Sequence, residues 1–170
     1  MRRHNTQWRL DLNQAVNKQW PPFLVAFLLE TNETRETMNS VVALIPHPSN
    51  SNLFLGVSRK TNQNDMGLPG GKADGHPKET FRDAMARELH EETGLNITSM
   101  KPLIKVSYGN QKTVWSFLVT TKEDKDLALK PLEEIVNTKE AGRVAWVTRE
   151  ELLAGSFGDY NRQLFTYLDF

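Results

Sequence analysis

The sequence predicts an α/β protein, of the α+β kind, in which a mixed β-sheet lies between helices. Three observations support this fold class. Short apolar or alternating segments, bounded by turn residues, recur along the chain and indicate strands. Apolar residues between positions 81 and 89 recur at helical spacing, and Thr93-Gly94 then stops that helix. Near the C-terminus, Thr148 and Glu151 form a capping box that starts another helix. A chain of 170 residues suits one domain with a sizeable core.

In the first half of the chain, three strands are predicted after an N-terminal extension. We assign residues 1–22 to the extension, because Pro21-Pro22 divides this polar segment from an apolar run, and residues 23–170 to a single domain. The strands are Phe23–Leu29, Val41–Ile45 and Leu53–Val57, of which the first two can form a hairpin. The run at 23–29 is far shorter than the roughly 20 residues of a membrane-spanning helix. No membrane insertion is therefore expected.

In the second half, a hairpin is followed by a strand and two helices. The hairpin joins Ile104–Tyr108 to Thr113–Val119 through a Gly109-Asn110 turn. The next strand is Arg143–Val147, after which helices are predicted through Leu153 and over Tyr160–Leu168. Alternation along the hairpin favours a core position for Trp115 and Phe117, although stacking on a nucleotide base explains the same pattern.

The helix that ends at Gly94 carries three closely spaced carboxylates. Residues three and four apart are neighbours on a helix, so Glu88 lies against both Glu91 and Glu92. Each such like-charge pair costs roughly 0.2 to 0.5 kcal/mol in a solvated helix. A bound divalent cation reverses that sign, and Mg²⁺ commonly bridges carboxylates to substrate phosphates. A solvated acidic face is the competing interpretation of these three residues alone.

The residues around this helix match a longer pattern. The segment GGKADGHPKETFRDAMARELHEETGL, from Gly70 to Leu95, resembles the signature of the Nudix hydrolases. Glu79, Arg87-Glu88, Glu91-Glu92 and Gly94 fall in register with it. One departure is that seven residues separate Gly71 from Glu79, where the family pattern has five. We place the extra pair in the turn-rich run 74–77, on the surface, where added length costs little.

The resemblance implies a fold, a metal site and structural roles. The fold is the Nudix α/β/α sandwich with a mixed sheet and a loop-helix-loop catalytic motif. Glu88, Glu91 and Glu92, with the Gly71 carbonyl, are expected to hold Mg²⁺, for which Mn²⁺ is expected to substitute. Arg87 is expected to pair with an acidic residue, most plausibly Glu79, and Gly94 to end the helix. These three residues are therefore structural in this interpretation.

Other candidate site residues lie partly outside the signature. Glu140 is the candidate general base, because a loop glutamate precedes a strand tryptophan at the same offset in some family members; an exposed solubilising charge is the alternative. Arg59, Lys60 and Lys72 are candidate phosphate ligands, with Lys72 favoured because the motif fixes its position. Arg59 and Lys60 have an equal claim to be ordinary surface charges. Tyr108 is a candidate for stacking on a base.

The implied reaction is hydrolysis of a nucleoside diphosphate linked to another moiety X, which makes the chain a Nudix pyrophosphohydrolase. The motifs that mark several substrate branches are not found, so a (d)NTP or similar small nucleotide is the leading substrate. A dinucleoside polyphosphate or ADP-ribose is the second candidate, since Tyr108 lies just short of where the dinucleoside branch places its tyrosine. A non-catalytic nucleotide sensor is the third, and the three intact glutamates argue against it.

Composition limits the partners and the compartment. Lys+Arg 21 balance Asp+Glu 21, so bulk binding to nucleic acid or to a membrane surface is not expected. The absence of cysteine excludes disulfides, thiolate metal sites and cysteine nucleophiles, and it fits a reducing compartment. The predicted location is the cytoplasm, and the predicted partner is a small nucleotide. A homodimer is compatible with the sequence.

Overall fold

The computed structural model describes residues 38–73, 79–108, 112–136 and 142–168. Several predictions fall outside these ranges. They are the N-terminal extension, its boundary at residue 22, the strand 23–29 with its hairpin, most of the enlarged loop at 74–77, the Gly109-Asn110 turn, and Glu140. Within the described ranges, no helix is both long and apolar enough to cross a membrane.

One sheet is mixed, as predicted. Its four strands run in the order β5-β1-β7-β6. The central pair is parallel, and both outer pairs are antiparallel. The strand bounds are β1 Met38–Leu44, β5 Gly70–Lys72, β6 Ile97–Tyr108 and β7 Lys112–Thr121.

A second sheet is antiparallel and is built around β3. Strand β3 pairs with β2, β4 and β8. The bounds are β2 Pro46–His47, β3 Asn50–Arg59, β4 Asn62–Gly67 and β8 Val144–Thr148. Because β4 runs directly into β5 through Leu68-Pro69, the two sheets are joined where the glycine-rich loop begins.

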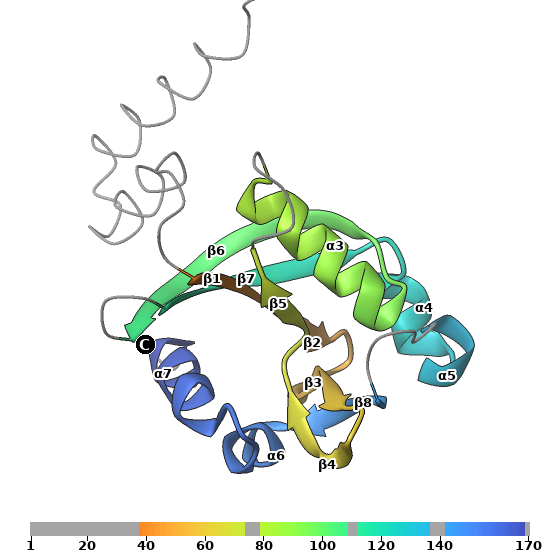
Figure 1. Ribbon diagram of the computed structural model, residues 1–170. Helices are drawn as coiled ribbons and strands as arrows, with labels where there is room; N and C mark the ends of the chain where they lie inside the picture. The colour runs from red at the N-terminus through yellow and green to blue at the C-terminus, as the bar shows by residue number, and fades with distance from the viewer. Residues whose placement is uncertain (1–37, 74–78, 109–111, 137–141, 169–170) are drawn as a thin grey trace, which may run out of the picture. The chain divides into compact units, whose positions relative to one another are not determined.

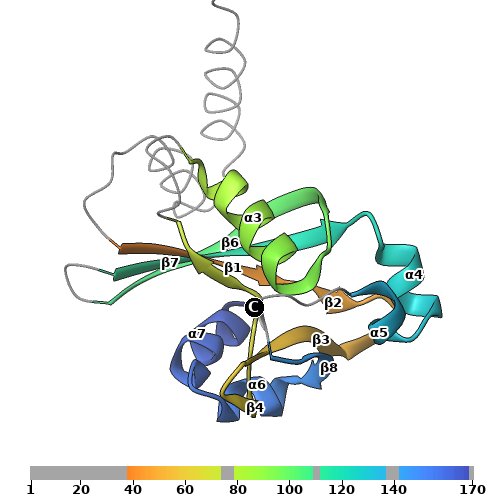
Figure 2. The ribbon, with the colours of Figure 1, turned by 45° about the vertical axis from the view of Figure 1, so that its right-hand side comes forward.

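Helices lie on both faces of the mixed sheet. Helix α3 (Phe81–Thr93) covers one face, and α7 (Gly158–Leu168) lies on the other, as Figures 1 and 2 show. The remaining helices are α4 Asp124–Leu129, α5 Leu132–Ile135 and α6 Arg149–Ala154. This arrangement of a sheet between helices is the predicted one, and it leaves α3 beside β5 and β1.

The core lies on both sides of the mixed sheet. On the α3 side, Ala84, Met85 and Leu89 are buried, and the ring of Phe81 stacks on Trp115 with centroids 4.7 Å apart. Trp115 and Phe117 are both buried, which agrees with their predicted core positions. The other side is filled by a cluster that joins α6 and α7 to strands of both sheets: Leu44, Met66, Leu68, Leu103, Val106, Val114, Val147, Leu152, Tyr160, Leu164 and Phe165.

The structure adds elements that the sequence pattern did not predict. The glycine-rich segment 67–72 contains strand β5, and the polar segment NQNDMG forms β4. Between the predicted strands 41–45 and 53–57, β2 and the start of β3 form a short hairpin. Helices α4 and α5 were not predicted either. These elements have little apolar periodicity, and neighbouring strands or short local hydrogen bonds define them.

Candidate active site

The acidic helix is fixed at both ends by local chemistry. Thr80 is the N-cap: its hydroxyl accepts from the Asp83 backbone N–H at 3.2 Å, and the Asp83 carboxylate accepts from the Thr80 N–H at 3.3 Å. At the other end, Gly94 is left-handed (φ 76°), and its N–H donates to the His90 carbonyl at 2.7 Å. Glycine adopts the left-handed backbone conformation at little energetic cost, because it has no Cβ. These caps fix the register that places the glutamates beside β5.

Strand β5 brings two glycines against the acidic helix. The Gly70 N–H donates to Glu92 Oε2 at 2.8 Å. Gly70 has φ +150°, and a Cβ there would collide with the Val41 carbonyl of β1. At Gly71, a Cβ would fall on the carboxylate of Glu88. Glycine is therefore needed at both positions, first for the backbone and then to leave room for a carboxylate.

Arg87 connects the helix to the loop and to its neighbouring acids. Its Nε donates to Glu79 Oε1 at 2.8 Å, and Nη2 donates to Glu79 Oε2 at 3.2 Å and to the Lys72 carbonyl at 2.9 Å. Nη1 donates to Glu88 Oε1 at 2.8 Å and to Glu91 Oε2 at 3.2 Å. The expected pairing of Arg87 with Glu79 is thus present despite the longer loop.

Burial disfavours the charged form of two of the carboxylates. Burial raises the pKa of Glu92 to about 7; the Gly70 N–H opposes this shift, while the charges of Glu88 and Glu91 add to it. Burial also raises the pKa of Glu88, against the favourable hydrogen bond and charge of Arg87. The helix therefore holds negative charge that its surroundings only partly compensate.

The divalent cation implied by the resemblance fits this donor set. Carboxylate and carbonyl oxygens are the ligands that Mg²⁺ prefers. The missing Cβ of Gly71 lets the Glu88 carboxylate lie directly against the β5 backbone. Within the described ranges, no three acidic or histidine side chains converge as a ready-made ligand cluster. The contacts explain this, because Glu88 and Glu91 turn toward Arg87 whereas Glu92 turns toward Gly70.

The candidate phosphate ligands lie in different places. Lys72 is at the end of β5, where its carbonyl accepts from Arg87 and its side chain is exposed. Arg59 ends β3; its Nε lies 3.8 Å from Asp65 Oδ2, and its guanidinium lies 5.1 Å from the centre of the Phe157 ring. Lys60 is exposed in the turn that follows. The backbone of Lys72 is therefore held next to the acidic helix.

The remaining two candidates are only partly described. Tyr108 ends β6 with 38% of its surface exposed; burial and the charge of Asp159 on α7 raise its pKa. Glu140 lies outside the described residues. The segment that follows it is fixed, because the Gly142 N–H donates to the Ser58 carbonyl at 3.1 Å and the Arg143 N–H to the Ser58 hydroxyl at 2.8 Å.

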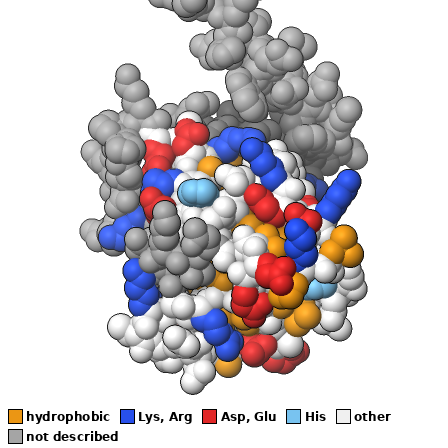
Figure 3. All heavy atoms as spheres, turned by 90° about the vertical axis from the view of Figure 1, so that its right-hand side faces the viewer, with side chains coloured by type: hydrophobic (Ala, Val, Ile, Leu, Met, Phe, Trp, Pro, Cys, Tyr) orange, Lys and Arg blue, Asp and Glu red, His pale blue; other side chains and the backbone are white. Residues whose placement is uncertain are grey.

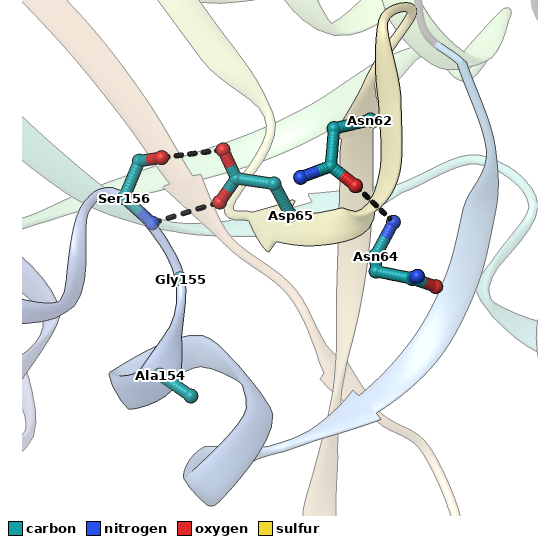
Figure 4. Close-up of a pocket in the computed structure, with 6 residues that line it drawn as sticks. All are labelled: Asn62, Asn64, Asp65, Ala154, Gly155 and Ser156. Carbon is teal, nitrogen blue, oxygen red and sulfur yellow. Dashed lines mark hydrogen bonds between the residues drawn. The ribbon is translucent and has the colours of Figure 1, made fainter.

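A cavity of about 370 Å³ lies away from these carboxylates, between β4 and the α6–α7 turn. Its lining is Asn62, Asn64, Asp65, Ala154, Gly155 and Ser156 (Figure 4). The Asp65 carboxylate faces Ser156 and accepts from both its N–H and its hydroxyl. The only carboxylate that lines the cavity, Asp65, is therefore already hydrogen-bonded. We call this contact the Asp65–Ser156 clamp, and its role is structural, because it joins β4 to the α6–α7 turn.

The comparisons with known proteins decide the family. A model of the NUDIX domain matches residues 37–168. The chain belongs to the NUDIX domain family. The predicted fold and enzyme class are thereby confirmed: this is a Nudix hydrolase, a class that acts on nucleoside diphosphate derivatives and generally uses a divalent metal. Comparison with curated proteins finds no match.

Solved structures agree with the Nudix fold. A MutT structure reported for Aliivibrio salmonicida and Vibrio cholerae is 18% identical, with a TM-score of 0.59, covering 79% of this chain and 98% of that one. MutT from Methanosarcina mazei is 21% identical, with a TM-score of 0.54 and coverage of 82% and 100%. The NUDIX domain of Shewanella oneidensis NrtR, complexed with ADP ribose, is 16% identical, with a TM-score of 0.56 and coverage of 85% and 96%.

The sequence did not reveal the role of Gly70. The hydrogen bond from Gly70 to Glu92 joins residues 22 positions apart. The sequence does show a glycine at position 70, and glycine is the residue that readily adopts φ +150°. The sequence could not indicate which carboxylate accepts a hydrogen bond from the Gly70 N–H.

Proposed function

We propose that this Nudix hydrolase cleaves a (d)NTP or a similar small nucleotide in a Mg²⁺-dependent reaction. The observation that carries the proposal is the convergence of Glu88 and Glu92 on the adjacent glycines of β5, with Glu91 one turn from Glu88. Glu88, Glu91, Glu92 and the Gly71 carbonyl are the proposed metal ligands. A bound Mg²⁺ would stabilise charge on the phosphate oxygens and activate water for attack on phosphorus.

The protein's own residues would position the substrate and accept the proton. Lys72 is proposed to bind a substrate phosphate, with Arg59 and Lys60 as secondary candidates. Glu140 is proposed as the general base that takes the proton from water as the anhydride P–O bond breaks. Arg87, Glu79 and Gly94 are proposed to hold the helix and the loop in place. Tyr108 is the proposed base-stacking residue.

A second candidate substrate is ADP-ribose or a dinucleoside polyphosphate. The similar NUDIX domain of NrtR binds ADP ribose, which supports testing this class. The exposed ring of Tyr108, at the end of β6, would offer it a stacking surface. A nucleotide sensor without turnover is the third candidate, and only an activity measurement separates it from the other two.

The proposed partner is the nucleotide itself, in the cytoplasm, as the cysteine-free composition suggests. On the described part of the face shown in Figure 3, acidic and basic side chains are interspersed. This mixture supports the expectation of no bulk nucleic-acid binding, because such binding depends on one-signed basic surfaces. A homodimer stays a prediction.

The test is a substrate screen that scores Mg²⁺-dependent release of monophosphate. It compares NTPs, dNTPs, ADP-ribose and dinucleoside polyphosphates, and the product pattern identifies the substrate. We expect Glu91→Gln and Glu92→Gln each to lower turnover at least about a hundredfold, which corresponds to about 3 kcal/mol of transition-state stabilisation. The control is Glu150→Gln, an exposed acid on α6, which should retain wild-type turnover. Normal hydrolysis by both test variants contradicts the metal assignment.

The general base needs a separate measurement. We expect Glu140→Gln to lower the rate strongly while the affinity for Mg²⁺, measured by calorimetry, is unchanged. Wild-type turnover in this variant would remove Glu140 from the mechanism. A parallel loss of metal affinity would instead make Glu140 a metal ligand.

A further inference from the structure

The guanidinium of Arg87 is divided between two tasks. An arginine has five N–H donors, and all five of Arg87 are used. The edge formed by Nε and Nη2 donates three bonds, to the Glu79 carboxylate and to the Lys72 carbonyl. The two bonds from Nη1 go to Glu88 and Glu91, the carboxylates proposed to hold the metal.

We propose that Nη1 of Arg87 is an internal counter-cation that competes with the divalent metal for Glu88 and Glu91. On metal binding, Nη1 gives up at least one of these carboxylates while the Nε–Nη2 edge stays on Glu79 and Lys72. The inference rests on the metal site of the proposed function. It adds that the helix arginine, besides anchoring the loop, lowers the affinity of that site for metal.

Competition follows from the position of Nη1. This single nitrogen lies 2.8 Å from a Glu88 oxygen and 3.2 Å from a Glu91 oxygen. A Mg²⁺ ion that uses both side chains needs an oxygen of each carboxylate at roughly 2.0 to 2.1 Å. It would then stand next to the guanidinium charge, and two cations that share one pair of carboxylates repel each other. The carboxylates therefore cannot serve both cations fully.

The contacts also indicate which bond is released. The Glu91 side chain is 45% exposed and has the longer bond to Nη1, whereas the Glu88 side chain is 16% exposed. The Glu79 side chain is only 5% exposed and receives two bonds in a fork. Exposed ion pairs are weak, and forked, buried ones are strong. The bond to Glu91 should therefore be given up first, and the Glu79 fork should persist.

The first experiment observes Arg87 directly in the full chain. Protein labelled with ¹⁵N-arginine is freed of metal with chelator and titrated with Mg²⁺, and the side-chain N–H resonances are followed by NMR. We expect the Arg87 Nη1 protons to shift and to exchange faster with water, while the Arg87 Nε–H resonance keeps its protection. An Nη1 signal that is unchanged at saturating Mg²⁺, or loss of the Nε–H protection, overturns the proposal.

The second experiment compares two variants that both damage the anchor. Arg87→Ala removes the anchor and the competitor, whereas Glu79→Gln weakens the anchor and leaves Nη1 in place. Calorimetric titration with Mg²⁺ should show at least threefold tighter binding to Arg87→Ala than to Glu79→Gln. Equal or weaker binding by Arg87→Ala means that the arginine is an anchor only. If Arg87→Ala does not fold, the NMR measurement on the wild-type chain decides alone.

The two proposals fail in different ways. If calorimetry detects no binding of Mg²⁺ to the wild-type chain, the metal site of the proposed function fails, and this inference fails with it. If Mg²⁺ binds and supports turnover while the Arg87 signals stay unchanged, only the counter-cation proposal is overturned.

Discussion

Two regions of this protein place an arginine beside carboxylates, with opposite electrostatic results. On α3, the arginine is Arg87, which contacts Glu88, and burial raises the pKa values of Glu88 and of Glu92 on the same helix. At the end of β3, the arginine is Arg59, and the pKa of its partner Asp65 is lowered, mainly by the Ser156 hydroxyl. An arginine with nearby carboxylates thus occurs in a region where carboxyl pKa values are raised and in a region where one is lowered.

The difference lies in the number of donors for each carboxylate. Asp65 accepts two hydrogen bonds from Ser156 and lies beside Arg59, so a single carboxylate has several donors. Around α3, the Arg87 guanidinium is shared among Glu79, Glu88 and Glu91, and the Gly70 N–H donates to Glu92. In a region with more carboxylates than donors, a bound cation compensates the excess negative charge. In a region with more donors than carboxylates, there is no such charge to compensate.

The largest expected effect comes from adding one methyl group to each region. In Gly71→Ala, the new Cβ meets the Glu88 carboxylate, the flexible end of a side chain that can rotate away. We expect little change in thermal stability but a loss of turnover of about 10- to 100-fold, because Glu88 leaves its position beside β5. Steady-state kinetics and thermal denaturation measure the two effects.

The matched variant is Gly155→Ala, in the α6–α7 turn. There the Cβ would meet the Met66 carbonyl, which is backbone and cannot rotate away. We expect a loss of about 1 to 3 kcal/mol in the free energy of unfolding, as for other overpacked sites, and nearly normal turnover from the folded fraction. If the two variants show the same pattern, the division into a binding region and a structural region is wrong.

A smaller effect is expected from pH. Because the pKa of Glu92 is raised to about 7 from its ordinary value of 4.5, the folded state binds its proton more tightly than the unfolded state does. Stability is therefore greatest below about pH 4.5 for this group and is lost as the pH rises through 7. Partial exposure reduces the expected loss to on the order of 2 kcal/mol. Denaturant unfolding of metal-free protein between pH 5 and 8 measures it.

The control for the pH effect is Glu92→Gln. This variant should lose the dependence and be more stable than wild type at pH 8. Added Mg²⁺ should stabilise the wild type most at high pH, because metal and proton compete for the same carboxylate. A metal-free wild type whose stability is flat over this range would mean that Glu92 is more solvated than its contacts indicate.

The smallest effect concerns substrate binding by Lys72 and Arg59, two of the three candidate phosphate ligands. Lys72 is tied through its carbonyl to Arg87, whereas Arg59 is already engaged by Asp65 and Phe157. We expect Lys72→Ala to raise KM by about 5- to 10-fold, and Arg59→Ala to raise it by less than about threefold. Initial-rate kinetics at fixed Mg²⁺ test this. The reverse order would move phosphate recognition to the end of β3.

Local features of the sequence predicted much of this site. The glycine that ends α3 was predicted from adjacent residues, and helical spacing places Glu88 beside Glu91; the Thr80–Asp83 capping box at the start of α3 was not predicted. The capping box of α6, by contrast, was predicted. The resemblance to the Nudix signature supplied the pairing of Arg87 with Glu79, which helical periodicity alone does not contain.

Contacts between distant segments were not predictable in this way. Strand β4 consists mainly of polar residues, and it exists because β3 offers it a hydrogen-bonding edge. The Asp65–Ser156 clamp joins residues 91 positions apart, and no local sequence pattern predicts it. Neither residue was a candidate in the sequence, yet both decide how Arg59 is held.

The sequence by itself determined the family, the acidic helix and the C-terminal end of that helix, because spacing and capping are properties of adjacent residues. Tertiary structure decided which carboxylates are buried, which one meets the Gly70 N–H, and how one guanidinium is shared. The physical reason is that desolvation and charge compensation depend on every group packed around a side chain. Those groups come from β1, β5 and α3, which only folding brings together.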